Sequence, residues 1–66
     1  MHDWVKIYSS DKPVEIEVAR AVLKENNIES VDVSKKDSVY IFGEVELYVR
    51  SEEEIMARII LKQHNL

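Results

Sequence analysis

The chain has 66 residues, 45% of them hydrophobic, and a net charge of −4 from 13 acidic and 9 basic side chains. This length predicts one domain over residues 1–66 with a small core, for which self-association would be a second source of stability. The absence of cysteine excludes disulfides and thiolate chemistry, the acidic charge disfavours nucleic-acid partners, and no apolar run reaches the ~20 residues that span a bilayer.

A strand is predicted near the start of the chain, at residues 4–8. Apolar side chains alternate there with polar and aromatic ones, in the two-residue period of a half-buried strand. Val5 and Ile7 fall on the face that we expect to meet the core. The opposite, outward face of this strand carries Trp4, Lys6 and Tyr8.

A helix is predicted from Pro13 to Asn27. Proline suits the first helical turn, Ser10 or Asp11 could cap that turn, and the asparagine pair at 26–27 is typical of a helix end. Apolar residues recur between these limits at the spacing of one buried helical stripe. The stripe consists of Ile16, Ala19, Val22 and Leu23.

Two more strands are predicted in the middle of the chain, at residues 29–34 and 44–50. In the first, Val31 and Val33 point to one side, and we expect Asp32 on the outward face. In the second, valine and leucine at 45, 47 and 49 face the core. The outward residues of this last strand are Glu44, Glu46, Tyr48 and Arg50.

A second helix is predicted from Ser51 to about Gln63. Ser51 and Glu54 match a capping box, in which the serine caps the helix and the glutamate reaches back to the serine. Helical spacing of apolar residues then predicts the buried stripe of this helix. The stripe consists of Ile55, Met56, Ile59 and Ile60.

The predicted order is strand, helix, strand, strand, helix, with one apolar face on each element. These elements close most simply as an α+β, truncated ferredoxin-like βαββα sandwich, which has a three-stranded antiparallel sheet and two helices on one face. The complete arrangement has a last strand beside the first one, so its absence leaves the edge of residues 4–8 unpaired. An unpaired edge invites another chain, which predicts a homodimer.

The outward face of the sheet is the first candidate site, because it gathers aromatic side chains with cations. Aromatic residues at such positions stack RNA bases in other proteins, but Glu44, Glu46 and Asp32 would repel phosphates, so we expect no nucleic acid here. An interface with a protein partner or a second copy fits better, and coverage by loop residues Tyr40 and Phe42 is the alternative. The partner-binding set is Trp4, Lys6, Tyr8, Tyr48, Tyr40 and Phe42.

The loop at residues 35–43 is the second candidate site. Lys35, Lys36 and Ser38 could bind a nucleotide or an anion there, or the loop could be a solvated turn. No histidine base accompanies the serine, so no catalytic residue is predicted. We expect no metal and no cofactor either, because the three carboxylates at 52–54 splay around a helix start and do not converge.

Four short motifs occur in order along the chain: Trp4 to Tyr8, Pro13 to Glu17, Lys36 to Ser38 and Gly43 to Val49. Their order over about residues 4–62 resembles the putative prokaryotic signal-transducing protein family. The resemblance implies a small bacterial ferredoxin-like domain, similar in fold to the nitrogen-regulatory signal proteins. Those proteins bind nucleotide and grip targets with a long loop, whereas the corresponding loop here is far shorter and has no glycine-rich segment.

These observations together predict a non-enzymatic signalling or protein-interaction module. It would act through the open edge of the first strand and the aromatic sheet face, with residues 40–42 modulating access. No secretory signal is visible at the beginning of the sequence, so we expect a cytoplasmic location and no membrane partner. The alternative is a sensor of a small ligand, which would use the loop between the second and third strands.

Overall fold

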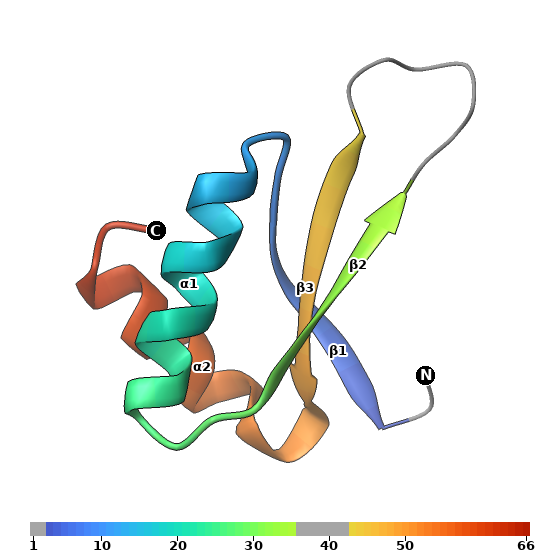
Figure 1. The fold of residues 1–66 in the computed structure, drawn as a ribbon. Helices are drawn as coiled ribbons and strands as arrows, with labels where there is room; N and C mark the ends of the chain where they lie inside the picture. The colour runs from blue at the N-terminus through green and yellow to red at the C-terminus, as the bar shows by residue number, and fades with distance from the viewer. Residues whose placement is uncertain (1–2, 36–42) are drawn as a thin grey trace.

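The computed structural model describes residues 3–35 and 43–66. Its elements are β1 (Trp4–Ser10), α1 (Pro13–Glu25), β2 (Ser30–Lys35), β3 (Glu44–Arg50), a 3-10 turn (Ser51–Glu53) and α2 (Glu54–Gln63). The sheet order is β1-β3-β2, with β3 antiparallel to both neighbours. Both helices lie on one face of this sheet (Figure 1). The predicted α+β ferredoxin-like class is confirmed.

The core lies between the sheet and the helices, and β3 contributes its centre. Leu47 and Val49 of β3 and Leu23 of α1 are fully buried. Burial of each such side chain stabilises the fold by roughly 1.5–3 kcal/mol. The stripe predicted for α1 is confirmed, since residues 16, 19, 22 and 23 are all buried.

The buried stripe predicted for the second helix is wrong in three of its four positions. The exposed residues are Ile55 (77%), Met56 (56%) and Ile59 (47%). The residues of α2 that face the core are Ala57, Ile60 and Leu61. Both sets have helical spacing, because residues 55–61 are apolar almost throughout, and the period alone therefore does not select the buried face.

A bulge in β1 turns Tyr8 toward the helices, which corrects its predicted outward orientation. Lys6 pairs with Tyr48 of β3. The next pair joins Tyr8 to Leu47, so two residues of β1 oppose one residue of β3. Tyr8 therefore shares the face of Leu47 and packs against the core. Burial, and secondarily the nearby Glu15 carboxylate, raises the pKa of the Tyr8 hydroxyl above its ordinary 10.0.

The two faces of β2 are the reverse of the prediction. Asp32 lies opposite Leu47 on the helix side, where Arg20 of α1 pairs with it at 3.2 Å. Val31 and Val33 lie instead on the face that carries no helix. β2 is an edge strand that α1 covers in part, and both charged side chains remain nearly half exposed, at 49% and 44%. The Asp32 carboxylate therefore stays hydrated on the helix side of the sheet and also forms an ion pair with Arg20.

Neither helix begins with a side-chain cap of the predicted kind. A 3-10 turn precedes α2, and no side chain bonds to the first N–H groups, so the capping box at Ser51 and Glu54 is wrong. At α1, the Ser10 hydroxyl accepts a hydrogen bond from the backbone N–H of Lys12 at 3.0 Å and donates one to Glu15. Ser10 thereby ties the end of β1 to the first turn of α1 without capping the helix.

Both helices end with an asparagine in the left-handed backbone region. Asn27 has a φ of 62°, and the N–H of Ile28 bonds back to the carbonyl of Leu23 at 2.9 Å. α2 ends with the same combination at Asn65 and Leu66. This is the Schellman motif, in which glycine is the commonest left-handed residue and asparagine the usual substitute. The helix end predicted at the asparagine pair is confirmed.

The left-handed conformation of Asn27 generates a stability prediction. Asn27→Ala should lower the free energy of unfolding by about 1 kcal/mol, because alanine tolerates this backbone region poorly. Asn27→Gly should leave that free energy unchanged or raise it slightly. Urea denaturation followed by circular dichroism would measure both, with Glu25→Ala, an exposed residue of the same helix, as the control. Equal losses for alanine and glycine would contradict the prediction.

Candidate functional site

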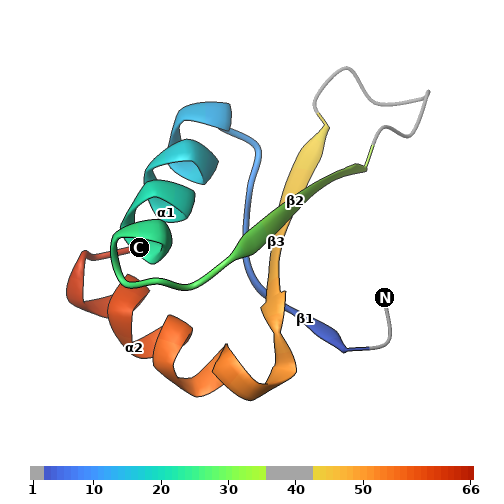
Figure 2. The ribbon, with the colours of Figure 1, turned by 60° about the horizontal axis from the view of Figure 1, so that its bottom comes forward.

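The outer sheet face is the surface of the sheet that carries no helix (Figures 1 and 2). Strand register places alternate residues of all three strands on it. Its residues with described side chains are Trp4, Lys6, Ser9, Val31, Val33, Glu44, Glu46, Tyr48 and Arg50. The surface thus combines aromatic, aliphatic and charged groups.

Glu46 is a buried acid in the middle of this face, with 5% of its surface exposed. A carboxylate so buried is costly unless hydrogen-bond donors surround it. Lys6 Nζ lies 3.2 Å from one of its oxygens, and the Tyr48 hydroxyl donates to the other oxygen over 3.0 Å. Glu46 therefore fixes a cation of β1 and an aromatic ring of β3 relative to each other.

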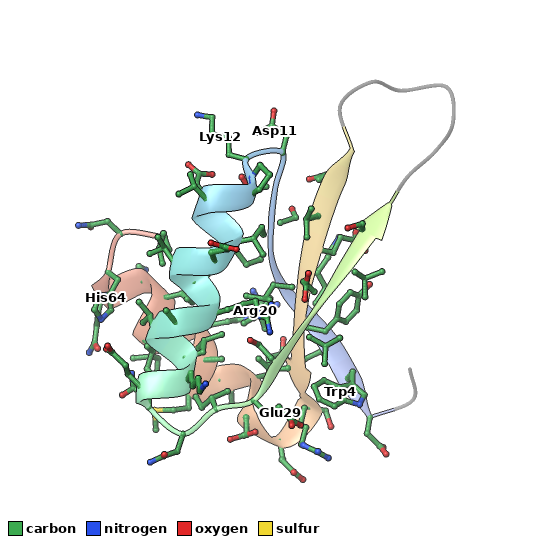
Figure 3. All side chains as sticks on the ribbon, viewed as in Figure 1. Trp4, Asp11, Lys12, Arg20, Glu29 and His64 are labelled. Carbon is green, nitrogen blue, oxygen red and sulfur yellow. The ribbon has the colours of Figure 1, made fainter. Side chains whose placement is uncertain are left out.

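Trp4 is held at one end of the same face by a charged neighbour. The Arg50 guanidinium lies 4.9 Å from the centre of the Trp4 ring, within the range of a cation–π contact. Arg50 also donates to the Glu29 carboxylate at 3.0 Å, just before β2. Figure 3 shows Trp4 on the side of the sheet away from the helices. The contact and the ion pair link β1, β3 and the residue that precedes β2.

Tyr48 is a hydrogen-bond donor and not a nucleophile. The bond to Glu46, followed by desolvation, raises the pKa of Tyr48 above its ordinary 10.0, and the opposing charge of Lys6 does not cancel this rise. The phenol therefore stays protonated at neutral pH. Within residues 3–35 and 43–66, no three histidine, aspartate or glutamate side chains group as a metal site would need.

The open edge of β1 is partly protected. Its bulge at residues 6–8 interrupts the regular ladder, and the Arg58 guanidinium of α2 donates to the backbone carbonyl of Lys6 at 3.1 Å. Glu54 holds the same guanidinium at 3.1 Å. Bulges and charged side chains are the usual means by which proteins discourage pairing at a sheet edge. Backbone pairing along β1 is therefore less favourable than the sequence implied.

The structure assembles part of the predicted site. The predicted partner-binding residues that lie on the outer sheet face are Trp4, Lys6 and Tyr48. Tyr8 lies on the opposite face of the sheet. Lys35 of the predicted ligand loop is the last residue of β2 and stands opposite Glu44. The predicted residues that lie outside the described part of the chain are Lys36, Ser38, Tyr40 and Phe42.

The residues of the face that the predicted partner-binding set lacks include Val31, Val33, Glu46 and Arg50. The alternation of Val31 and Val33 shows that both lie on one face of their strand, but in an edge strand it does not tell which face of the sheet that is. Glu46 follows the same outward alternation as its neighbours, and nothing in the sequence marks it as buried. The spacing of Glu46 and Tyr48, two residues apart on one strand, is the signal that could have suggested their hydrogen bond.

A shallow groove of about 840 Å³ lies away from this face, between α1 and the beginning of β2. Arg20 and Lys24 line it together with Glu17 and Glu29, so its charges nearly cancel. Arg20 reaches from α1 toward the sheet and is engaged by Asp32 (Figure 3). The groove contains none of the residues predicted to bind a ligand.

The raised pKa of Tyr48 can be tested by ultraviolet titration of tyrosinate. Glu46→Gln should lower the pKa of Tyr48 toward 10.0, because it weakens the hydrogen bond that the phenol donates and removes the charge that opposes ionisation. The Tyr48→Phe spectrum identifies the transition that belongs to this residue, and Glu44→Gln is the control. The pKa of Tyr48 is higher in the folded state than in the unfolded state, so the protonated phenol stabilises the folded state. This stabilisation is fully present below pH 10.0 and is lost as the pH rises through the raised pKa. An unchanged transition in Glu46→Gln would contradict the assignment.

Comparison with known proteins gives one result. A family model described as Putative prokaryotic signal transducing protein matches residues 4–65. No curated protein and no solved structure matches the chain. No helix among the described residues is long and apolar enough to cross a membrane. Because the family match covers nearly the whole sequence, the chain belongs to this prokaryotic signal-transducing family.

Proposed function

We propose that this chain is a non-enzymatic, cytoplasmic signalling protein that binds a protein partner through its outer sheet face. The observation that carries the proposal is the composition of that face. Trp4, Tyr48 and two valines of β2 stand on a surface that no helix covers, with cations beside them. Aromatic and arginine side chains are the groups that most often dominate protein interfaces.

The charges on the face indicate the chemistry of the partner. Lys6 and Arg50 flank Trp4 and remain about half exposed, at 52% and 47%. Each is already held by one carboxylate, yet each keeps further N–H groups directed to solvent. A partner surface with apolar and acidic side chains would match this arrangement. The end of the face around Trp4, where Lys6 and Arg50 lie, is thus suited to an acidic, partly apolar protein surface.

The internal bonds of the face support binding at low entropic cost. Lys6 and Tyr48 are anchored on Glu46, and Trp4 is anchored on Arg50. Side chains that are ordered before binding lose less freedom on association, which at an interface costs roughly 0.5–1.5 kcal/mol for each flexible side chain.

The alternative function, a nucleotide or anion sensor at Lys35, Lys36 and Ser38, stays a prediction that thermal-shift assays with nucleotides would test.

Site-specific photo-crosslinking in the source organism would test the proposal. A photo-reactive residue at position 33, on the outer sheet face, should crosslink one protein that a probe at position 18, on α1, does not. That protein would then be purified and titrated by calorimetry. Trp4→Ala should weaken its binding at least tenfold, which corresponds to about 1.4 kcal/mol, as expected for an aromatic anchor.

A matched pair of variants separates the outer sheet face from the rest of the surface. Val33→Ser changes that face, and Val18→Ser makes the same change on α1. Binding should weaken in the first and stay as in the wild type in the second. Loss of binding in Val18→Ser alone, or wild-type affinity in Trp4→Ala, would show that the partner docks elsewhere.

A further inference from the structure

A second apolar surface lies on the helices, on the side of the molecule opposite the outer sheet face. Five large apolar residues of the helices are 47–77% exposed: Val14, Val18, Ile55, Met56 and Ile59. Among the described residues, these are the large apolar side chains with the greatest exposure. Neighbouring exposed apolar side chains on a small protein usually mark a contact surface, and Ile55 and Ile59 are neighbours on α2.

Two of these residues, Ile55 and Ile59, form one row on α2. Ile55 and Ile59 are one helical turn apart, and each is two positions from the fully buried Ala57. At about 100° per residue, two positions place a side chain roughly 160° around the helix from Ala57. Since Ala57 faces the core, the two isoleucines point away from it. The far side of α2 is therefore an apolar ridge.

The charges along α2 reverse from one end to the other. Glu52 and Glu53 precede the helix, and Lys62 lies in its last turn. Glu52 is three positions before Ile55, and Lys62 is three positions after Ile59. An antiparallel second copy of α2 that sets Ile55 against Ile59 would also bring Glu52 level with Lys62 of that copy. The ridge is therefore complementary to itself in charge and in apolar character.

We propose that two copies of this chain associate through the far sides of their α2 helices, packed antiparallel about a two-fold axis that passes midway between Ile55 and Ile59. Such an interface is isologous, so each contact occurs twice. Ile55 and Ile59 form its centre, and an acid–base pair closes each end. The antiparallel alignment also places the positive end of each helix dipole beside the negative end of the other, which is favourable.

This association uses a different surface from the proposed partner binding, so both can occur at once. It rests on the proposed function only in that dimerisation would strengthen the binding of the partner. The helices and the outer sheet face are on opposite sides of the sheet (Figures 1 and 2). A dimer joined through α2 therefore leaves both outer sheet faces accessible, pointing away from the interface. Two such faces on one particle would bind a partner with two or more sites by avidity.

Sedimentation equilibrium of the full chain over a wide concentration range would test the association. The wild type should dimerise, and Ile59→Ser should raise the dissociation constant at least tenfold. Trp4→Ala, on the outer sheet face, should dimerise as the wild type does. Circular dichroism would verify that each variant is folded. A wild type that stays monomeric at millimolar concentration, or a dimer that Trp4→Ala dissociates and Ile59→Ser does not, would overturn the proposal.

A charge-reversal experiment identifies the orientation of the two helices. Glu52→Lys places two lysines at each end of the interface, and Lys62→Glu places two acids there, so each variant alone should dimerise roughly tenfold more weakly. An equimolar mixture pairs lysine with glutamate at both ends and should recover the wild-type dissociation constant. Because the mixture contains the same two chains, damage to the fold could not produce this recovery. No recovery would overturn the antiparallel arrangement.

Discussion

Every strand pairing in the described chain involves β3, and this constraint organises the molecule. β1 and β2 each pair with β3 and not with each other. Successive side chains of β3 therefore serve two different surfaces. Leu47 and Val49 complete the core, while Glu46 and Tyr48 order the outer sheet face. A slip of one residue in β3 would exchange these roles and place the carboxylate of Glu46 among the helices, so the register is strongly fixed.

The same strand explains why recognition is expected from side chains more than from a backbone edge. The bond of Tyr48 to Glu46 and the contact of Arg50 with Trp4 hold the groups of the outer sheet face in place. At the margin of the sheet, the β1 bulge and Arg58 interrupt the ladder that another strand would need. The rigid part of the molecule that faces solvent is thus a set of side chains over β3.

How far the sequence predicts this structure depends on how strongly each segment is patterned. The element order, the stripe of α1 and both faces of β3 are predicted, because their periods are long and one face is clearly apolar. The site is predicted in part, at Trp4, Lys6 and Tyr48. Tyr8 is misplaced because one inserted residue in β1 reverses a face without disturbing the alternation before it. Asp32 is misplaced because an edge strand tolerates a hydrated charge on the side of the helices.

The wrong prediction of the buried stripe of α2 has a different origin, and it points to a second apolar face on this helix. A surface helix of a small domain needs one apolar stripe, and α2 has a second row that packing against the sheet does not use. Isoleucine at position 55 is 77% exposed and at position 59 is 47% exposed, so the monomer leaves much of this apolar surface in contact with water. The period is ambiguous because two faces of the helix are apolar, one toward the core and one toward solvent. The second row has a physical reason if another copy of α2 covers it, and the reversal of charge between Glu52 and Lys62 is what such a copy requires.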